Sequence, residues 1–225
     1  MREVVLDTET TGLDPLAGHR LVEIGCVELM NMVATGRSLQ LYLNPEMLMP
    51  AEALRVHGLT DEFLADKPLF ADKVDELIEF LGDAQLVIHN AQFDLGFLNA
   101  ELVRAGRAKL VNEYVDTVSL ARRKFPGQRA SLDALCERFS IDNTKRTKHG
   151  ALLDSELLAE VYLELSGGRQ RDLGLAPEMA ATGLSSLMAV KRPVRPARPH
   201  AASESELAAH AEFLKKVTDP IWLKE

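Results

Sequence analysis

Residues 4–12, with the sequence VVLDTETTG, begin as an apolar run and end in two carboxylates one residue apart. Side chains on a β-strand alternate between its two faces, so Val5, Asp7 and Glu9 point the same way. Two carboxylates held this close raise each other's pKa unless a cation lies between them, and a divalent metal with oxygen ligands is the natural candidate. The stretch therefore predicts either a metal site or a strand that runs out into a solvated acidic loop.

The composition suits one domain with an appendage, because 225 residues with 46% hydrophobic content bury a substantial core. No stretch is apolar for long enough to span a bilayer, and the start does not resemble a signal peptide, so we expect a cytoplasmic protein. The two cysteines, Cys26 and Cys136, have apolar neighbours and are expected to be buried free thiols.

The charge is unevenly distributed. The net charge is -8, with 17 Lys and Arg against 27 Asp and Glu in residues 1–166 and nine against seven in residues 167–225. An acidic body argues against broad binding to duplex phosphates. It still allows a small site in which metal ions neutralise a phosphate.

The N-terminal part predicts an antiparallel meander. Residues 20–32 and 35–43 are rich in Val, Leu and Ile and form two further strands, joined by a short turn near Gly36. Residues 51–56 then form a short helix before a loop over 57–60. A helix over 71–81 follows, with an apolar stripe of Val74, Leu77, Ile78 and Leu81.

Strands alternate with helices in the next part. Residues 86–89 are a strand covered on both faces, and residues 111–115 are the last strand. A helix lies between them, with Leu95, Leu98, Leu102 and Val103 as its buried stripe. Two more helices are expected over 117–124 and 131–139. The order indicates an α/β domain with a mixed five-stranded sheet flanked by helices.

The helix over residues 150–166 contains an anomaly. Asp154 precedes Leu157, Leu158 and Val161 by helical spacings, so it lies on the apolar stripe. A buried carboxylate needs a partner or a metal. His149 is five positions away, which is ~140° of rotation on a helix, so it reaches Asp154 only from a loop before Gly150.

The C-terminal part changes in character after Gly168. Residues 169–202 are dense in Ala, Pro, Arg and Ser and predict an extended or flexible linker. Helical spacing returns over 203–217, with Ser203 or Ser205 as N-cap, and Trp222 follows. We expect residues 203–225 to be a docking segment on a domain that spans residues 1–168.

Five residues carry the chemistry, and they are Asp7, Glu9, Asp94, His149 and Asp154. Acids that hold two divalent ions, with a histidine as base, suit the hydrolysis of a phosphodiester. In the order DTE (7–9), NAQFD (90–94) and His149 with Asp154, these motifs resemble the DEDD exonucleases that carry a histidine in their last motif. The match spans residues 3–166. The resemblance is strongest to the proofreading subunits of bacterial replicative DNA polymerases.

The resemblance implies an RNase H-like fold and 3'-to-5' exonuclease activity with magnesium or manganese, two ions per site. Asp7 would bridge both ions, Glu9 and Asp154 would hold the ion that activates water, and Asp94 would support the second. His149 would be the general base. Substrate-binding residues would be Asp7, Glu9, Asp154, Thr10 and His57, the last two at the terminal nucleotide.

Several nearby residues have other readings. A basic group just before the base either guides the phosphates of the strand or forms a solvated charge run; it consists of Lys145, Arg146 and Lys148. Asp116 is expected to cap the following helix. His89 is left out of the catalytic set.

The tail implies partners. Residues 203–225 would dock on the polymerase catalytic subunit. Residues Gln170 to Leu175 loosely resemble peptides that bind the bacterial sliding clamp, although Gly174 and the lack of an aromatic residue depart from that pattern. Tethering of this kind would deliver the single-stranded 3' end of DNA to an acidic nuclease.

Two other functions remain open. A free-standing nuclease of the same family would act on RNA or short oligonucleotides, and the four acids do not separate DNA from RNA. A non-catalytic scaffold would have no use for a complete set of acids and base.

Overall fold

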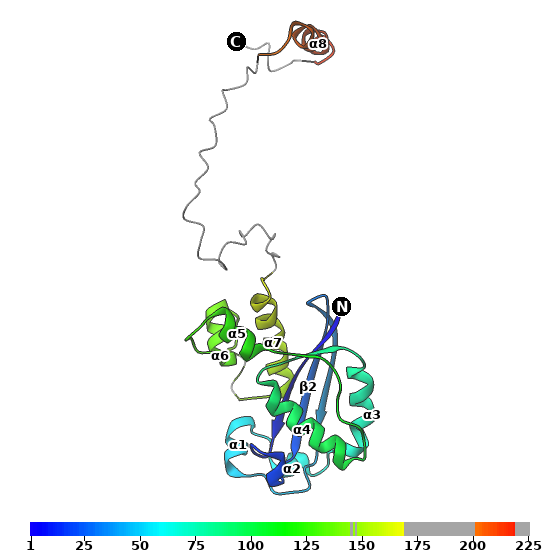
Figure 1. Ribbon diagram of the computed structural model, residues 1–225, viewed down its shortest axis with the longest axis vertical. Helices are drawn as coiled ribbons and strands as arrows, with labels where there is room; N and C mark the ends of the chain where they lie inside the picture. Colours follow the sequence, from blue (N-terminus) through cyan, green and yellow to red (C-terminus); the bar gives the residue numbers. More distant parts are fainter. Residues whose placement is uncertain (145, 147, 169–200, 219–225) are drawn as a thin grey trace, which may run out of the picture. The chain divides into compact units, whose positions relative to one another are not determined.

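Five strands form one mixed sheet in the computed structural model, which describes residues 1–144, 146, 148–168 and 201–218. The strand order is β3-β2-β1-β4-β5, so β1 lies in the middle (Figure 1). The chain divides into two units, Met1–Leu175 and Ala176–Glu225. The predicted fold class, a mixed five-stranded sheet flanked by helices, is confirmed.

The first three strands form the predicted antiparallel meander. They are β1 (Arg2–Thr10), β2 (Leu21–Met30) and β3 (Val33–Tyr42). The turn expected near Gly36 is wrong, because the hairpin closes at Asn31 and Met32 with φ angles of 52° and 66°. Two residues with positive φ match the twist of paired strands, so β3 begins before Gly36.

Two parallel strands extend the sheet beyond β1, first β4 (Gln85–Ile88) and then β5 (Tyr114–Asp116) at the edge. Leu86, Val87 and Ile88 are fully buried, which confirms that β4 is covered on both faces. The last strand starts later than expected. Val111 is 96% exposed, and pairing with β4 begins only at Tyr114.

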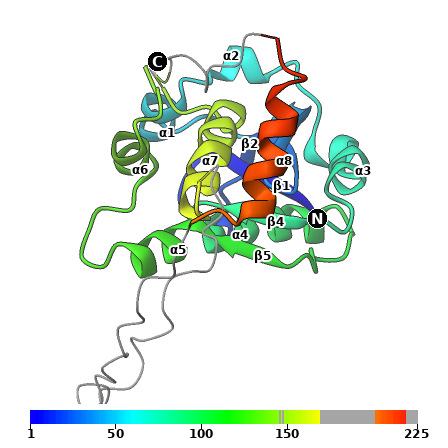
Figure 2. The ribbon, with the colours of Figure 1, turned by 90° about the horizontal axis from the view of Figure 1, so that it is seen from above.

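Helices cover both faces of the sheet, and Figure 2 shows α3 and α6 on opposite sides of it. On the face of Val4 and Leu6 lie α3 (Phe70–Leu81) and α4 (Ala91–Arg104). On the face of Val5 lie α5 (Thr117–Lys124), α6 (Leu132–Phe139) and α7 (Ala151–Leu165). The alternation predicted for β1 is therefore confirmed, and each face has its own apolar core.

Three short helices complete the first unit: η1 (Pro15–Ala17), α1 (Ala51–His57) and α2 (Asp61–Leu64). The sequence predicts neither η1 nor α2, and α1 runs one residue further than expected, to His57. Within the described parts of the chain, no helix is long and apolar enough to cross a membrane. Cys26 and Cys136 are buried and free, as predicted.

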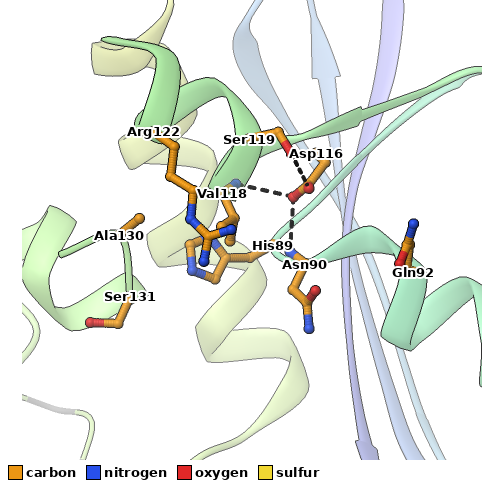
Figure 3. Close-up of a pocket in the computed structure, with 9 residues that line it drawn as sticks. All are labelled: His89, Asn90, Gln92, Asp116, Val118, Ser119, Arg122, Ala130 and Ser131. Carbon is orange, nitrogen blue, oxygen red and sulfur yellow. Dashed lines mark hydrogen bonds between the residues drawn. The ribbon is translucent and has the colours of Figure 1, made fainter. Parts of the chain in front are cut away.

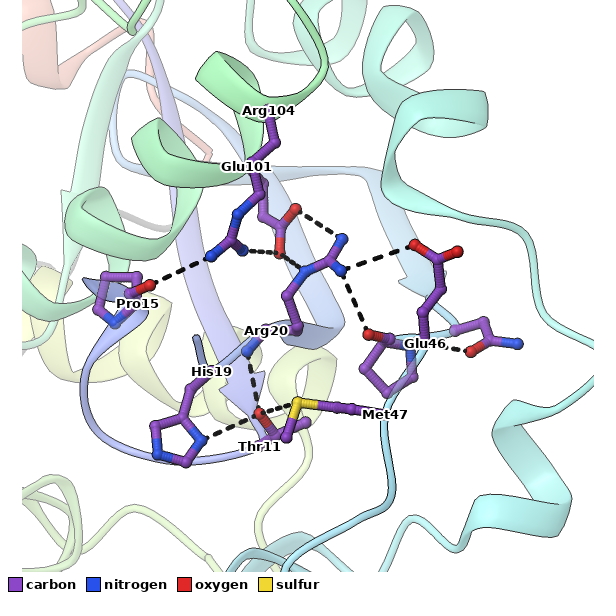
Figure 4. A network of polar contacts seen from close by, with 10 residues as sticks. Thr11, Pro15, His19, Arg20, Glu46, Met47, Glu101 and Arg104 are labelled. Carbon is purple, nitrogen blue, oxygen red and sulfur yellow. Dashed lines mark hydrogen bonds and ion pairs between the residues drawn. The ribbon is translucent and has the colours of Figure 1, made fainter. Parts of the chain in front are cut away.

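Two residues expected in buried stripes are exposed, Ile78 of α3 by 39% and Val103 of α4 by 54%. The buried surface of α4 instead includes the carboxylate of Glu101, which accepts hydrogen bonds from Arg20 Nε at 2.6 Å and Nη2 at 3.0 Å (Figure 4). Arg104 Nη1 adds a third at 3.1 Å. This network fastens the start of β2 to α4.

In the second unit, α8 spans Glu204–Leu214 and ends before the predicted limit of residue 217. Of the two predicted N-cap candidates, Ser203 caps it. Its apolar side chains Leu207 and Phe213 are 57% and 58% exposed. The clamp-like peptide and Trp222 lie outside the described residues, and the domain boundaries at 168 and 202 stay predictions.

Candidate active site

The carboxyl end of β1 presents acids on the face that α7 covers. Asp7 and Glu9 point to this face, and Glu9 is 8% exposed. Thr8 points to the opposite face, where its Oγ1 donates a hydrogen bond to Asp94 Oδ1 at 2.7 Å. One strand thus supplies two carboxylates and orients a third.

Asp94 lies in the first turn of α4, just after β4, and is 2% exposed. The turn into the helix is tight, since Asn90 has a φ of 71°. β1 and β4 are parallel neighbours, so their carboxyl ends meet at the same edge of the sheet. This arrangement brings Asp94 to the acids of β1.

Asp154 reaches the site from α7 and is 3% exposed, which confirms its predicted inward position. The helix crosses β2 very closely at Gly25, where Ser155 Oγ donates to the Gly25 carbonyl at 3.0 Å. A Cβ on Gly25 would lie 2.2 Å from the carbonyl carbon of Ala151. Gly25 carries no signal in the sequence, because nothing there says which helix crosses this strand.

His149 lies in the loop before the N-cap Gly150, as predicted. Its Nδ1 is 3.2 Å from Asp154 Oδ2, and its side chain is 48% exposed. Its backbone N–H donates to the carbonyl of Val56 at 3.2 Å, which attaches the loop to α1. The imidazole therefore has one nitrogen beside a buried carboxylate and an edge open to water.

The carboxylates strongly favour a positive charge. Desolvation raises the pKa of Asp7 well above its usual range, and the charges of Asp94, Glu9 and Asp154 raise it further. Burial, with the charge of Asp154, raises the pKa of Glu9 to about 8, and burial raises the pKa of Asp94 to about 7. Among the residues described, Asp7, Glu9 and Asp94 form no ion pair.

Arg146 is a counter-charge within the site. Its Nε and Nη2 donate to the two oxygens of Asp154 at 2.5 and 2.7 Å, and its Nη1 donates to Asp133 Oδ1 at 2.6 Å. Burial would raise the pKa of Asp154, but hydrogen bonds from His149 and Arg146 lower it. The side chain of Arg146 is 8% exposed, so of the two interpretations offered by the sequence, the solvated charge run is wrong at this position. Lys148 is exposed, and Lys145 lies outside the described residues.

A metal fits this donor set. Glu9, His149 and Asp154 offer ligand atoms that all lie within 4.8 Å of one another. Asp7 and Asp94 lie beside this group, since the charges of Glu9 and Asp154 raise the pKa of Asp7, and the charge of Asp94 raises the pKa values of Asp7 and Glu9. Carboxylate oxygens are the ligands that hard divalent ions such as Mg²⁺ and Mn²⁺ prefer.

A cavity of about 530 Å³ adjoins Glu9 and is lined by Thr10, His57 and Phe93 among others. His57 Nδ1 accepts a hydrogen bond from Leu59 N at 3.0 Å, which assigns the ring proton to Nε2. In the described part of the chain, this buried Nε2 has no hydrogen-bond partner. Burial lowers the pKa of His57 and an interaction with the Thr10 backbone partly offsets this, so the ring is held at the cavity wall beside Thr10.

Two further residues lie outside the metal-ligating group. Asp116 caps α5, as predicted, because its oxygens accept from Val118 N at 3.0 Å and Ser119 Oγ at 2.7 Å. His89 Nδ1 lies 2.9 Å from Thr117 Oγ1. This contact agrees with its omission from the catalytic set.

Comparisons with known proteins agree on one family. A family model described as exonuclease matches residues 4–162. DNA polymerase III subunit epsilon of Rickettsia felis is 47% identical over 225 residues, covering 96% of this chain and 97% of the relative. The protein of the same name from Escherichia coli is 45% identical over 227 residues, covering 96% and 93%.

Solved structures share the fold. Exonuclease X in complex with 5' overhanging duplex DNA aligns with a TM-score of 0.58 and 26% identity, over 73% of this chain and 90% of that one. The nuclease domain of 3'hExo, a DEDDh family member bound to rAMP, aligns with a TM-score of 0.64 and 19% identity, over 76% and 94%. The second likeness is one of fold alone.

Proposed function

The chain belongs to the exonuclease family, and from this premise we propose that it is a DEDDh member whose residues hydrolyse the 3'-terminal phosphodiester of DNA. It is a metal-dependent 3'-to-5' exonuclease, the proofreading subunit of a replicative DNA polymerase, DNA polymerase III. The observation that carries the mechanism is the meeting of four carboxylates and one half-exposed histidine at one edge of the sheet.

The four carboxylates would hold two divalent ions, Mg²⁺ or Mn²⁺. Glu9 and Asp154 would hold one ion near His149, Asp94 would support the other, and Asp7 would contribute to both. Bound ions of this kind polarise the phosphate and lower the pKa of water. Asp7, Glu9 and Asp154 thereby also position the phosphate of the terminal nucleotide.

His149 takes the proton of the attacking water. When Asp154 Oδ2 accepts the Nδ1–H of His149, the lone pair of Nε2 is free to act as the base. Arg146 Nη2 lies 2.7 Å from the same Nδ1 and would donate to it, which demands the opposite tautomer. The base is therefore available only when Arg146 leaves Nδ1.

The terminal nucleotide occupies the cavity beside Glu9. Thr10 and His57 line it and would contact the terminal nucleotide. Burial lowers the pKa of His57, so the ring is neutral and does not hold the product by charge. That property suits an enzyme that must release each nucleotide.

A point mutant tests the mechanism. The protein and an Asp7→Ala variant would be incubated with Mg²⁺ and a 3'-mismatched DNA primer, with an RNA oligomer of equal length alongside. Loss of an acid that touches both ions should lower kcat by at least about 10³-fold. Asp83→Ala, which removes an exposed carboxylate between α3 and β4, is the matched control. Equal activity of Asp7→Ala and the control contradicts the mechanism, and a strong preference for RNA contradicts the DNA substrate.

The tail supplies the partner contacts in this proposal. Residues 203–225 dock on the polymerase catalytic subunit, supported by the exposed Leu207 and Phe213 of α8. Residues Gln170 to Leu175 bind the sliding clamp, on the strength of their sequence alone. A tethered nuclease gains a high effective concentration at the primer end.

Deletion of residues 201–225 tests the tail. Copurification with the polymerase subunit should be lost, while hydrolysis of a free nucleotide ester should continue because the acids all lie before residue 169. Retained copurification would place the docking surface on the nuclease unit.

A further inference from the structure

The guanidinium of Arg146 is shared between two helices. On one side its Nε and Nη2 donate to the two oxygens of Asp154 on α7, at 2.5 and 2.7 Å. On the other side its Nη1 donates to Oδ1 of Asp133, in the first turn of α6, at 2.6 Å. The two carboxylates differ in exposure, because the side chain of Asp154 is 3% exposed and that of Asp133 is 61% exposed. Arg146 therefore joins a buried candidate metal ligand to an acid at the surface.

The backbone around Arg146 is held in place without help from Asp154. The N–H of Arg146 donates to the carbonyl of Asn143 at 2.9 Å, and Asn143 Nδ2 donates to Asp133 Oδ1 at 3.2 Å. The N–H of His149 is attached separately to α1. A rotation of the Arg146 side chain is thus enough to release Asp154, and the loop that carries His149 can keep its position.

Asp133 can accept the guanidinium by itself. The hydrogen bonds that its carboxylate accepts from other described residues, Arg146 and Asn143, both end on Oδ1. Oδ2 is available for a second N–H, so Asp133 can form the parallel pair of bonds that suits a guanidinium. A guanidinium that leaves a buried carboxylate needs another counter-charge, because a charge of low exposure without a partner is costly. Asp133 provides this counter-charge while it keeps its present contact with Nη1.

We propose that Asp133 is a positioning residue that receives Arg146 when a divalent ion binds Asp154. The inference rests on the proposed function, because it requires the metal site of that function. While Arg146 stays on Asp154, its Nη2 also lies 2.7 Å from Nδ1 of His149. The same movement of one side chain therefore frees both the carboxylate and the base.

Asp133 lies outside the two cavities that open at the first turn of α4. It does not line the cavity of Thr10 and His57, nor a second one, of about 510 Å³, whose wall includes Ser131 at the start of α6 (Figure 3). Among the described residues, the group that could hold a metal ion does not include Asp133 either. A change at Asp133 should therefore act on metal binding through Arg146 and leave the KM for DNA unchanged.

The test measures Mn²⁺ binding by isothermal titration calorimetry in the parent, Asp133→Asn, Arg146→Gln and the double variant. Asp133→Asn should weaken binding about fivefold, on the scale of a partly exposed ion pair, because the released guanidinium lacks its acid. In the Arg146→Gln background the same exchange should change nothing, because no guanidinium remains to be received. Glu137→Gln is the matched control, since Glu137 is an exposed acid on α6 whose ion pair is with Arg129.

Hydrolysis of a single-stranded DNA oligonucleotide gives a second readout. Asp133→Asn should raise the Mn²⁺ concentration of half-maximal activity by the same factor as the dissociation constant. The kcat at saturating Mn²⁺ and the KM for the oligonucleotide should stay as in the parent, because excess ion displaces Arg146 in any case. Asp133→Glu, which keeps the carboxylate, should restore most of the affinity.

An equal loss of affinity in both backgrounds would mean that Asp133 acts directly by its charge. An unchanged affinity of Asp133→Asn, or a loss as large in Glu137→Gln, would mean that Arg146 needs no acceptor at this position. Each of these results overturns the proposal. A parent protein that binds no Mn²⁺ would instead overturn the proposed function, and this inference with it. Thermal unfolding of the variants checks that α6 is intact.

Discussion

Arg146 and the metal compete for the same carboxylate. Its guanidinium contacts both oxygens of Asp154, so an ion bound there must displace at least one of these hydrogen bonds. The bidentate ion pair of Arg146 with Asp154 is largely desolvated and therefore costly to break, so Arg146 opposes metal binding.

Removal of the Arg146 guanidinium should raise the affinity of the site for a divalent metal ion. Arg146→Gln should bind Mn²⁺ about tenfold more tightly than the parent, because Asp154 is freed and a positive charge leaves the site. Isothermal titration calorimetry measures it directly, with Arg123→Gln, which removes an exposed charge on α5, as the control. Unchanged or weaker binding would show that Arg146 supports the ion instead of opposing it.

The contact between helix α7 and strand β2 determines how deeply Asp154 is buried in the site. Gly25→Ala would place a methyl group 2.2 Å from backbone of Ala151, so the helix must move outward. We expect a loss of about 1–3 kcal/mol in the free energy of unfolding, with a fall in kcat because Asp154 and His149 shift with the helix.

Gly96→Ala is the matched control for this change. Gly96 lies within α4, and a Cβ there meets nothing within 4 Å. The exchange of glycine for alanine inside a helix should raise stability by about 0.5–1 kcal/mol. Urea unfolding measures the free energy of unfolding of both variants. If Gly25→Ala leaves this free energy unchanged, α7 tolerates the displacement.

The sequence predicts helices, strands and the direction of side chains better than it predicts which distant residues contact each other. The inward position of Asp154 follows from its place on an apolar stripe, and the shared face of Asp7 and Glu9 follows from strand alternation. Val103 is exposed because its helix turns Glu101 inward to Arg20, a pairing between residues 81 positions apart. The role of Gly25 and the pairing of Arg146 also depend on which elements meet. These contacts belong to tertiary structure.

The buried carboxyl groups of Asp7, Glu9 and Asp94 make the stability of the whole protein depend on pH. Folding raises the pKa values of Asp7, Glu9 and Asp94, so the folded state binds protons that the unfolded chain has released. The stabilisation is complete below the ordinary carboxyl pKa near ~4 and is lost as the pH rises through about 7 for Asp94 and about 8 for Glu9.

The melting temperature of the protein in EDTA should therefore fall between about pH 5 and pH 9, as Asp94 and Glu9 lose their protons. Saturating Mg²⁺ should flatten the decline, because the ion replaces the protons as counter-charge. Scanning calorimetry in both media measures this. A melting temperature that rises over the same range would contradict the raised pKa values.

The order of the motifs along the chain has a consequence during synthesis. Asp7 and Glu9 leave the ribosome first, but His149 lies just before α7 and Asp154 within it, and α7 is the last helix among the described residues of the nuclease unit. A nascent chain that has not yet released residues 149–165 has neither the base nor the fourth acid, and β2 lacks its cover at Gly25. Nuclease activity is thus the last property that this unit acquires, so unfinished chains are harmless to nucleic acid.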